Sequence, residues 1–187
     1  GYQKRCREEA PARRLMERSR AAEADRSKPR ERYLLVDGYN IIFAWKELNE
    51  LAAQNIDSAR DRLMDIMCNY KAAVSADVIV VFDAYRIRGH DTEHLDVNNI
   101  HVVYTREAQT ADRYIEEFAH ENGARYDITV VTSDGLEQII IRGEGCRLIS
   151  SREFEKEVKR VCDEHLRSYS EGSRESNRTY LGEWLNL

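Results

Sequence analysis

Four aspartates lie where runs of apolar residues give way to polar ones. Asp37, Asp83 and Asp134 each end a short run with the composition of a buried strand. Asp112 lies in the first turn of the helix predicted after another such run, which ends at Thr105. In parallel sheets, ligands bind beyond the carboxyl ends of the strands, and these ends share one edge. The four carboxylates are therefore expected to converge at that edge.

Carboxylates in such a cluster repel one another unless they are protonated or neutralised by a cation. Ligand sets made only of oxygen favour Mg²⁺ or Mn²⁺ over Zn²⁺, and these ions keep waters that substrate phosphates can replace. We expect Asp37, Asp112 and Asp134 to bind the metal directly or through water, and Asp83 to bind it or to orient a water. The predicted chemistry is metal-assisted attack of water on a phosphodiester. A turn role is the alternative for each aspartate taken alone, and the coincidence of four favours a site.

Other polar residues near these aspartates are candidate site residues. Asn40 is expected to start the helix after the first strand, where its amide could cap that helix or bind a metal-bound water or a phosphate. Tyr85, Arg86 and Arg88 belong to a polar loop that begins at the same edge. This loop is either an ordinary exposed connection or an RNA contact, in which arginine pairs with phosphate and tyrosine stacks on a base. Ser133 could hydrogen-bond a metal ligand or contact RNA, and a turn role is its alternative.

The elements that must position these residues alternate between two periodicities. Apolar, β-branched runs predict strands, and helical spacing of apolar residues predicts helices between them. Strands that are apolar throughout and separated by helices indicate a mainly parallel sheet covered on both faces, so the predicted fold class is three-layered α/β. The predicted strands are 33–37, 77–84, 99–105, 127–134 and 146–151. The predicted helices are 58–74, with Asp57 or Ser58 as its N-cap, 110–123, 151–169 and, as a short helix or turn, 135–143.

Signatures of other chemistries are missing from the sequence. It contains no GxxxxGK[ST] or GxGxxG phosphate loop after the first strand, no HExxH zinc pattern and no GxSxG nucleophile elbow. The four cysteines include no CxxC pair, which indicates neither a zinc site nor a disulfide framework. No apolar stretch approaches the roughly 18 to 20 residues of a membrane helix, and no signal peptide is recognisable. We therefore expect a cytoplasmic protein without membrane contact.

Charge is distributed unevenly along the 187 residues. Residues 1–32 carry 11 Lys and Arg against 6 Asp and Glu, whereas the remainder carries 18 against 28. We expect residues 1–32 to be a basic linker or charged helical arm, either inert or in contact with RNA or the ribosome. Residues 33–170 are expected to form the folded domain. Residues 171–187 are expected to be a tail that could dock back through Trp184.

Five segments occur in an order that resembles the NYN domains, a branch of the PIN-like ribonucleases, and within them the YacP-like ribosome-associated endoribonucleases of Gram-positive bacteria. The segments are "LLVDGYNIIFAW", "ARDRLMD", "VIVVFDA", "VVYTREAQTADRYIE" and "VVTSDGLEQ". The resemblance implies a PIN-like α/β fold and cleavage of RNA that depends on Mg²⁺ or Mn²⁺. The acids of the family fall on Asp37, Asp112 and Asp134, with Asp83 and Asn40 beside them. The YacP-like branch further implies action on mRNA associated with the translating ribosome, at the ribosomal A site.

The amino end departs from this family, whose members usually begin close to the first strand. The opening "GYQ" without Met indicates a linker from a larger polypeptide, and we hypothesise fusion to an upstream translation-factor-like GTPase. Two other functions remain to be tested against the ribonuclease. A non-catalytic RNA- or ribosome-binding adaptor could keep the fold, but the presence of all four acids argues against it. A phosphatase with an aspartyl nucleophile would require a second Asp where Tyr39 stands.

Overall fold

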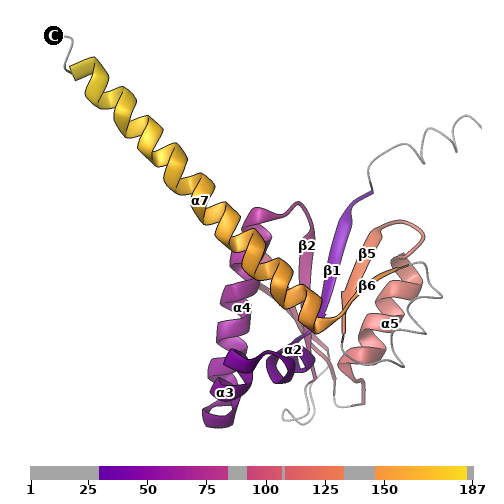
Figure 1. Cartoon of the computed structure of the whole chain (residues 1–187). Coiled ribbons are helices and arrows are strands. Elements are labelled where there is room, and N and C mark those ends of the chain that lie inside the picture. The colour runs from indigo at the N-terminus through magenta and orange to yellow at the C-terminus, as the bar shows by residue number, and fades with distance from the viewer. Residues whose placement is uncertain (1–29, 84–91, 107, 133–145, 185–187) are drawn as a thin grey trace, which may run out of the picture. The chain divides into compact units, whose positions relative to one another are not determined.

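The computed structural model describes residues 30–83, 92–106, 108–132 and 146–184, with side chains described as far as Ser170 apart from that of residue 169. Residues 32–187 form one compact unit, built around a single six-stranded sheet (Figure 1). The strand order is β3-β4-β2-β1-β5-β6, and all neighbours are parallel except β3 and β4. The strands are β1 (Arg32–Asp37), β2 (Asp77–Phe82), β3 (Glu93–Val97), β4 (Ile100–Tyr104), β5 (Asp127–Val131) and β6 (Arg147–Ile149).

Helices cover both faces of this sheet, which confirms the predicted three-layer α/β fold. The helices among the described residues are α2 (Gly38–Ala44), α3 (Lys46–Gln54), α4 (Ile56–Ala73), α5 (Ala111–Asn122) and α7 (Ser151–Trp184). Four of them, α2, α3, α4 and α7, share one hydrophobic core with the sheet, and α5 packs on the other face. Among the described residues, no helix combines the length and apolar character needed to cross a membrane.

The two cores explain why the strands read as continuous apolar runs. Along β1, Leu34 and Val36 are buried in the core shared with α4 and α7, whereas Leu35 is buried in the core shared with α5. Successive side chains of a strand point to opposite faces, so a strand covered on both faces must be apolar at every position. Burial on both faces therefore fixes the direction and register of β1 inside the sheet.

β1 occupies the position that matters for a ligand. It pairs with β2 on one side and with β5 on the other. The chain first builds outward from β1 to β2 and β4, and then returns to the opposite side of β1 to form β5. Such a reversal opens a crevice outside the carboxyl ends of the strands. That end of β1 is where α2 begins, and it carries Asp37.

Some local predictions were wrong or incomplete, and others lie outside the described residues. α4 begins at Ile56 because the Asn55 side chain, rather than Asp57 or Ser58, accepts hydrogen bonds from the first backbone N–H groups. β3 was not predicted. Four of its five residues are exposed, and "EHLDV" lacks a clear alternation of apolar and polar residues. The helix predicted to end at residue 169 continues along its backbone to Trp184. The helix or turn predicted at 135–143 lies outside the described residues, as do the side chain of Trp184 and the docking proposed for it.

Candidate active site at the carboxyl end of the sheet

Asp37 joins β1 to α2 and is buried, with 8% of its surface exposed. Its carboxylate is the N-cap of α2, accepting a hydrogen bond of 3.1 Å from the backbone N–H of Asn40. An acidic cap is favourable because the first N–H groups of a helix have no partner within the helix. One residue therefore ends a central strand, starts a helix and places a carboxylate at the edge of the sheet.

Gly38 allows the backbone after Asp37 to pass directly against the sheet. A Cβ atom at this position would lie 2.3 Å from Cε1 of the Phe82 ring, which is itself fully buried at the end of β2. No side chain fits in that space without moving the ring. The glycine is thus explained by a close approach of backbone and aromatic ring, and it fixes the start of α2 relative to β2.

Asp83 follows β2 and Asp112 lies at the start of α5, and a hydrogen bond holds these two segments together at the same edge of the sheet. The backbone N–H of Ala111 donates a hydrogen bond to Oδ1 of Asp83, which ties the first turn of α5 to the end of β2. Thr110 caps the helix by accepting a hydrogen bond of 3.3 Å from the N–H of Arg113. Asp112 lies in this anchored first turn, as predicted. Two strand ends and one helix start therefore bring three carboxyl groups together.

The electrostatics of these groups show that they form one cluster. The pKa of Asp37 is raised to about 7, first because the carboxyl is buried, and also because of a side-chain hydrogen bond with Asp112 and the charges of Asp112 and Asp83. The Asn40 N–H acts in the opposite direction. Burial also raises the pKa of Asp83, as does the charge of Asp112, while the hydrogen bond from Ala111 lowers it. A shared proton or a cation relieves this repulsion.

Asn40 supplies an oxygen to the same region. The prediction that Asn40 starts the helix was wrong. Asp37 takes the cap position, because its carboxylate accepts the hydrogen bond from the Asn40 N–H, and Asn40 lies inside the first turn. The side-chain Oδ1 of Asn40 is buried and has no hydrogen-bond partner within the part of the chain that the structure describes. A buried acceptor without a donor costs about 1–3 kcal/mol. The oxygen is therefore available to a donor such as water or to a cation.

The donor set suits the predicted ions, although only part of it lies in the described chain. Asp37, Asp83, Asp112 and Asn40 offer oxygen atoms alone, which favours Mg²⁺ or Mn²⁺. Within the described residues, no group of three or more His, Cys, Asp and Glu side chains is arranged to hold a metal ion. The remaining predicted residues lie outside the described part of the chain; these are Asp134, Ser133, Tyr85, Arg86 and Arg88.

An aromatic cluster beside the carboxylates was not predicted. Tyr39 and Phe43 project from α2, and Arg60 of α4 donates a hydrogen bond of 3.3 Å to the Tyr39 hydroxyl. The sequence did contain a signal for Phe43. Ile41, Ile42 and Trp45 point into the core, so a phenylalanine among them on a seven-residue helix must face away from it.

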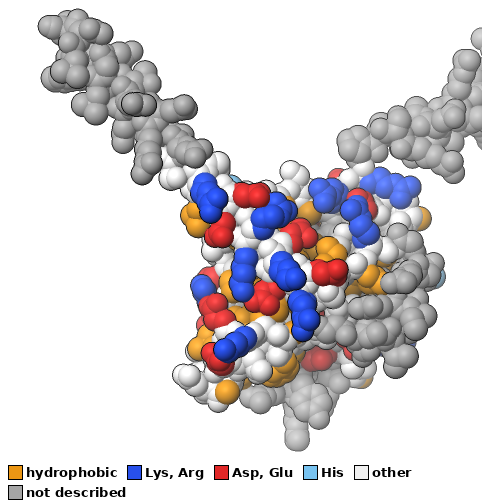
Figure 2. All heavy atoms as spheres, in the orientation of Figure 1, with side chains coloured by type: hydrophobic (Ala, Val, Ile, Leu, Met, Phe, Trp, Pro, Cys, Tyr) orange, Lys and Arg blue, Asp and Glu red, His pale blue; other side chains and the backbone are white. Residues whose placement is uncertain are grey.

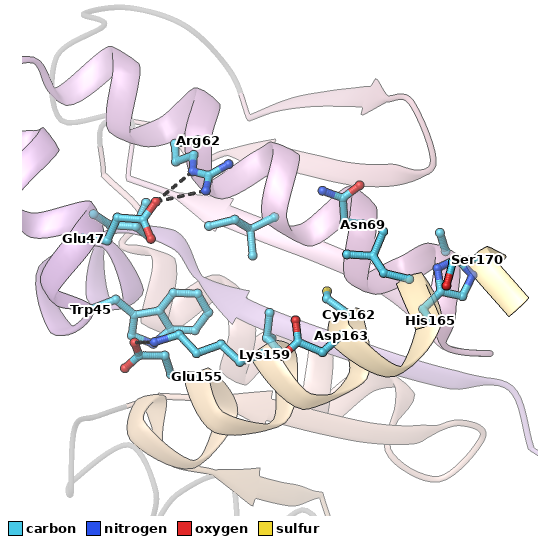
Figure 3. Close-up of a pocket in the computed structure, with 15 residues that line it drawn as sticks. Trp45, Glu47, Arg62, Asn69, Glu155, Lys159, Cys162, Asp163, His165 and Ser170 are labelled. Atoms are coloured by element: carbon cyan, nitrogen blue, oxygen red, sulfur yellow. Dashed lines mark hydrogen bonds and ion pairs between the residues drawn. The ribbon is translucent and has the colours of Figure 1, made fainter. Parts of the chain in front are cut away.

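A cavity of about 720 Å³ lies elsewhere, between α4 and α7 (Figure 3). Apolar side chains such as Ile66 and Leu166 line it, and the ion pair between Arg62 and Glu47 stands at its rim. Figure 2 shows this face of the molecule, where Lys and Arg alternate with Asp and Glu over α4 and α7. Of the candidate site residues that the structure describes, none lines this cavity. It is separate from the carboxylate cluster.

The comparisons with known proteins agree on one family. The model of the YacP-like NYN domain matches residues 34–186. Over 129 residues, the chain is 40% identical to uncharacterized protein YacP of Bacillus subtilis (strain 168), a match that covers 68% of this chain and 75% of that protein. The crystal structure of Rae1 (YacP) from Bacillus subtilis is similar with a TM-score of 0.65 and 35% identity, covering 82% of this chain and 89% of that one. The structure of a tryptophan-to-leucine mutant of Rae1 (YacP) is similar with a TM-score of 0.66 and 36% identity, covering 78% and 85%.

Proposed function

Because this chain belongs to the YacP-like NYN domain family, which has a nuclease-type fold, we propose that it is a metal-dependent endoribonuclease that hydrolyses phosphodiester bonds in RNA. The observation that supports this proposal best is the cluster of Asp37, Asp83 and Asp112 at the carboxyl end of the sheet. Their mutual effects on pKa describe a site with surplus negative charge. A divalent cation and a substrate phosphate together would balance that charge.

Each residue has a proposed role that follows from its position. Asp37 and Asp112, together with Asp134, would hold Mg²⁺ or Mn²⁺, and a bound ion of this kind lowers the pKa of water and stabilises the leaving oxygen. Asp83 holds the first turn of α5 in place through the Ala111 N–H and so positions Asp112. Asn40 offers its buried Oδ1 to a water or an ion at the same edge.

The substrate we propose is mRNA on the translating ribosome, as the resemblance to the YacP-like branch implies. The charge distribution is consistent with a partner that supplies part of the binding surface. Residues 1–32 have a net charge of +5, whereas the remainder has a net charge of −10. An acidic domain repels a polyanion unless cations or a partner surface intervene. We also propose that the protein is located in the cytoplasm and that it is fused to an upstream translation-factor-like GTPase.

The experiment compares RNA cleavage by the wild type, Asp37→Asn and Asp65→Asn, with Mg²⁺ or Mn²⁺, on ribosome-bound mRNA and on naked RNA. Asp65 is an exposed aspartate of α4 and serves as the matched control. We expect cleavage by the wild type and by Asp65→Asn, and a loss of at least about 100-fold in Asp37→Asn, since a metal ligand and its charge are removed. If wild type and Asp37→Asn were equally inactive on both substrates, the proposed endoribonuclease activity would be contradicted. RNA or ribosome binding without cleavage would then favour the adaptor.

A further inference from the structure

An exposed aromatic ring lies on α2, the helix that begins at the Asp37 cap. Phe43 on α2 has 57% of its surface exposed, although it is a large apolar residue. Removing an aromatic ring from water lowers the free energy, so a ring held in a fixed position offers a favourable contact to a ligand. α2 also carries Asn40 and begins at the Asp37 cap, which places Phe43 on the helix that builds the proposed active site.

The ring of Phe43 is the exposed end of a row of aromatic residues that leads to the sheet. It stacks on Tyr39 with a centroid distance of 6.3 Å and an interplanar angle of 20°. The Tyr39 ring meets Phe82 edge-on at 5.2 Å, and Phe82 stacks on Tyr104 at 5.5 Å. Such pairs favour particular ring geometries over others. The row therefore connects the exposed ring to the buried end of β2, where Phe82 also packs against Gly38.

Arg60 fixes this row from α4. Its guanidinium donates a hydrogen bond to the Tyr39 hydroxyl at 3.3 Å and lies 5.9 Å from the centre of the Tyr104 ring. It also forms an ion pair with Asp57. These contacts hold Tyr39 in one orientation and place a positive charge beside the aromatic rings. Arg60 is thus a positioning residue for the surface formed by Tyr39 and Phe43.

We propose that Tyr39 and Phe43 form a stacking surface for an unpaired RNA base next to the bond that is cleaved. Aromatic side chains bind bases of any sequence, because every base has a π-face, but they require a base that is not already stacked in a helix. An aromatic ring attached to the helix that presents Asp37 would position the adjacent phosphate. This inference rests on the proposed ribonuclease function and concerns the same site.

The first experiment measures binding without cleavage. Full-length Asp37→Asn protein is titrated into a single-stranded oligoribonucleotide that contains 2-aminopurine, whose fluorescence falls when it stacks. Phe43→Ala and Phe43→Leu are added to this background, with Phe43→Trp as the conservative change and Leu166→Ala as the control. Leu166 is 68% exposed and lies on α7. Thermal unfolding checks that each variant is folded.

We expect Phe43→Ala and Phe43→Leu to weaken binding by about 5- to 100-fold and to lose the quenching, because leucine keeps the apolar volume but has no π-face. Phe43→Trp should retain both, and Leu166→Ala should match the parent protein. A fully paired RNA of the same sequence should bind equally in all variants. Unchanged affinity and quenching in Phe43→Ala, or no binding of single-stranded RNA by the parent, would overturn the inference.

A second experiment separates this inference from the proposed function. Cleavage rates are measured for wild type and Phe43→Ala over a range of RNA concentrations. We expect KM to rise with a smaller change in kcat, since a binding contact away from the reacting atoms is lost. Equal KM values with intact cleavage would overturn the stacking surface and leave the ribonuclease standing. Base stacking that depends on Phe43, without cleavage by the wild type, would overturn the ribonuclease and leave the surface standing.

Discussion

The Phe82 ring fills the space that a side chain at Gly38 would need, since a Cβ atom there would lie 2.3 Å from Cε1 of the ring. We therefore predict that Gly38→Ala destabilises the protein by about 1–3 kcal/mol, because the buried ring or the start of α2 must move. Urea unfolding monitored by circular dichroism measures the change. Gly123→Ala is the matched control: Gly123 ends α5 with φ −59°, a conformation that alanine adopts without strain. Equal stability of Gly38→Ala and wild type would contradict this packing.

The Asp37 carboxyl predicts how metal-free stability depends on pH. Burial and the neighbouring carboxylates raise its pKa to about 7 in the folded protein, well above the ordinary value of an aspartate, so the folded state holds the proton more tightly than the unfolded state does. Between these two values the wild type should lose stability as the pH rises. Asp37→Asn keeps a cap acceptor but cannot ionise, so it should be more stable than wild type at pH 8, by on the order of 2 kcal/mol, and close to it at pH 4. Urea unfolding in EDTA at both pH values tests this; the same difference at both would contradict it.

The stabilisation of the protein by a bound metal ion should increase as the pH rises, whereas the stability of the metal-free protein should decrease. If Asp37 and Asp112 hold Mg²⁺ or Mn²⁺, protons compete with the ion for these carboxylates. Saturating metal is expected to raise the Tm of the wild type by a few degrees at pH 8 and by less at pH 5.5. Thermal unfolding with and without metal measures the shift. Asp112→Asn should lose the shift and Asp65→Asn should keep it, and equal shifts in these two variants would exclude Asp112 from the metal site.

Trp45 predicts how α7 is attached to the domain. Its Nε1–H donates a buried hydrogen bond of 2.9 Å to the Ser151 carbonyl at the start of α7, and its ring packs against Phe154. Trp45→Phe keeps an aromatic ring but removes this buried hydrogen bond, so we expect a loss of about 0.5–1.5 kcal/mol. Urea unfolding measures it, with Phe43→Ala as a control that changes an exposed aromatic residue. RNA cleavage by Trp45→Phe should stay unchanged well below its melting temperature. Equal stability of Trp45→Phe and wild type would contradict a structural role for this hydrogen bond.

The parts of the fold predicted correctly are those with the strongest local signals. β1, β2, β4 and β5 were recognised because strands buried on both faces are rich in apolar, β-branched residues. Asp112 was placed in the first turn of its helix because apolar residues within 110–123 recur at helical spacing. The family assignment made from the same motifs is confirmed by the match to residues 34–186.

What the sequence concealed depends on contacts between distant residues. The order of the carboxyl groups around the sheet edge requires the hydrogen bond from Ala111 to Asp83, and nothing local predicts it. Asn40 could not be distinguished from Asp37 as a helix cap, because both side chains accept hydrogen bonds from N–H groups. The row from Phe43 to Tyr104 joins three elements, so it became visible only once the sheet had been assembled.

The pairing of β1 has a consequence for how the protein is made. During synthesis the first strand must wait for β5, which lies far later in the chain, and Phe154 of α7 completes the core behind it. Contacts between segments so distant in sequence form slowly and only after both segments exist. A nascent chain that has exposed Asp37 therefore has a carboxylate but no assembled site. The carboxyl groups of the candidate site therefore come together only after almost the whole domain has been translated.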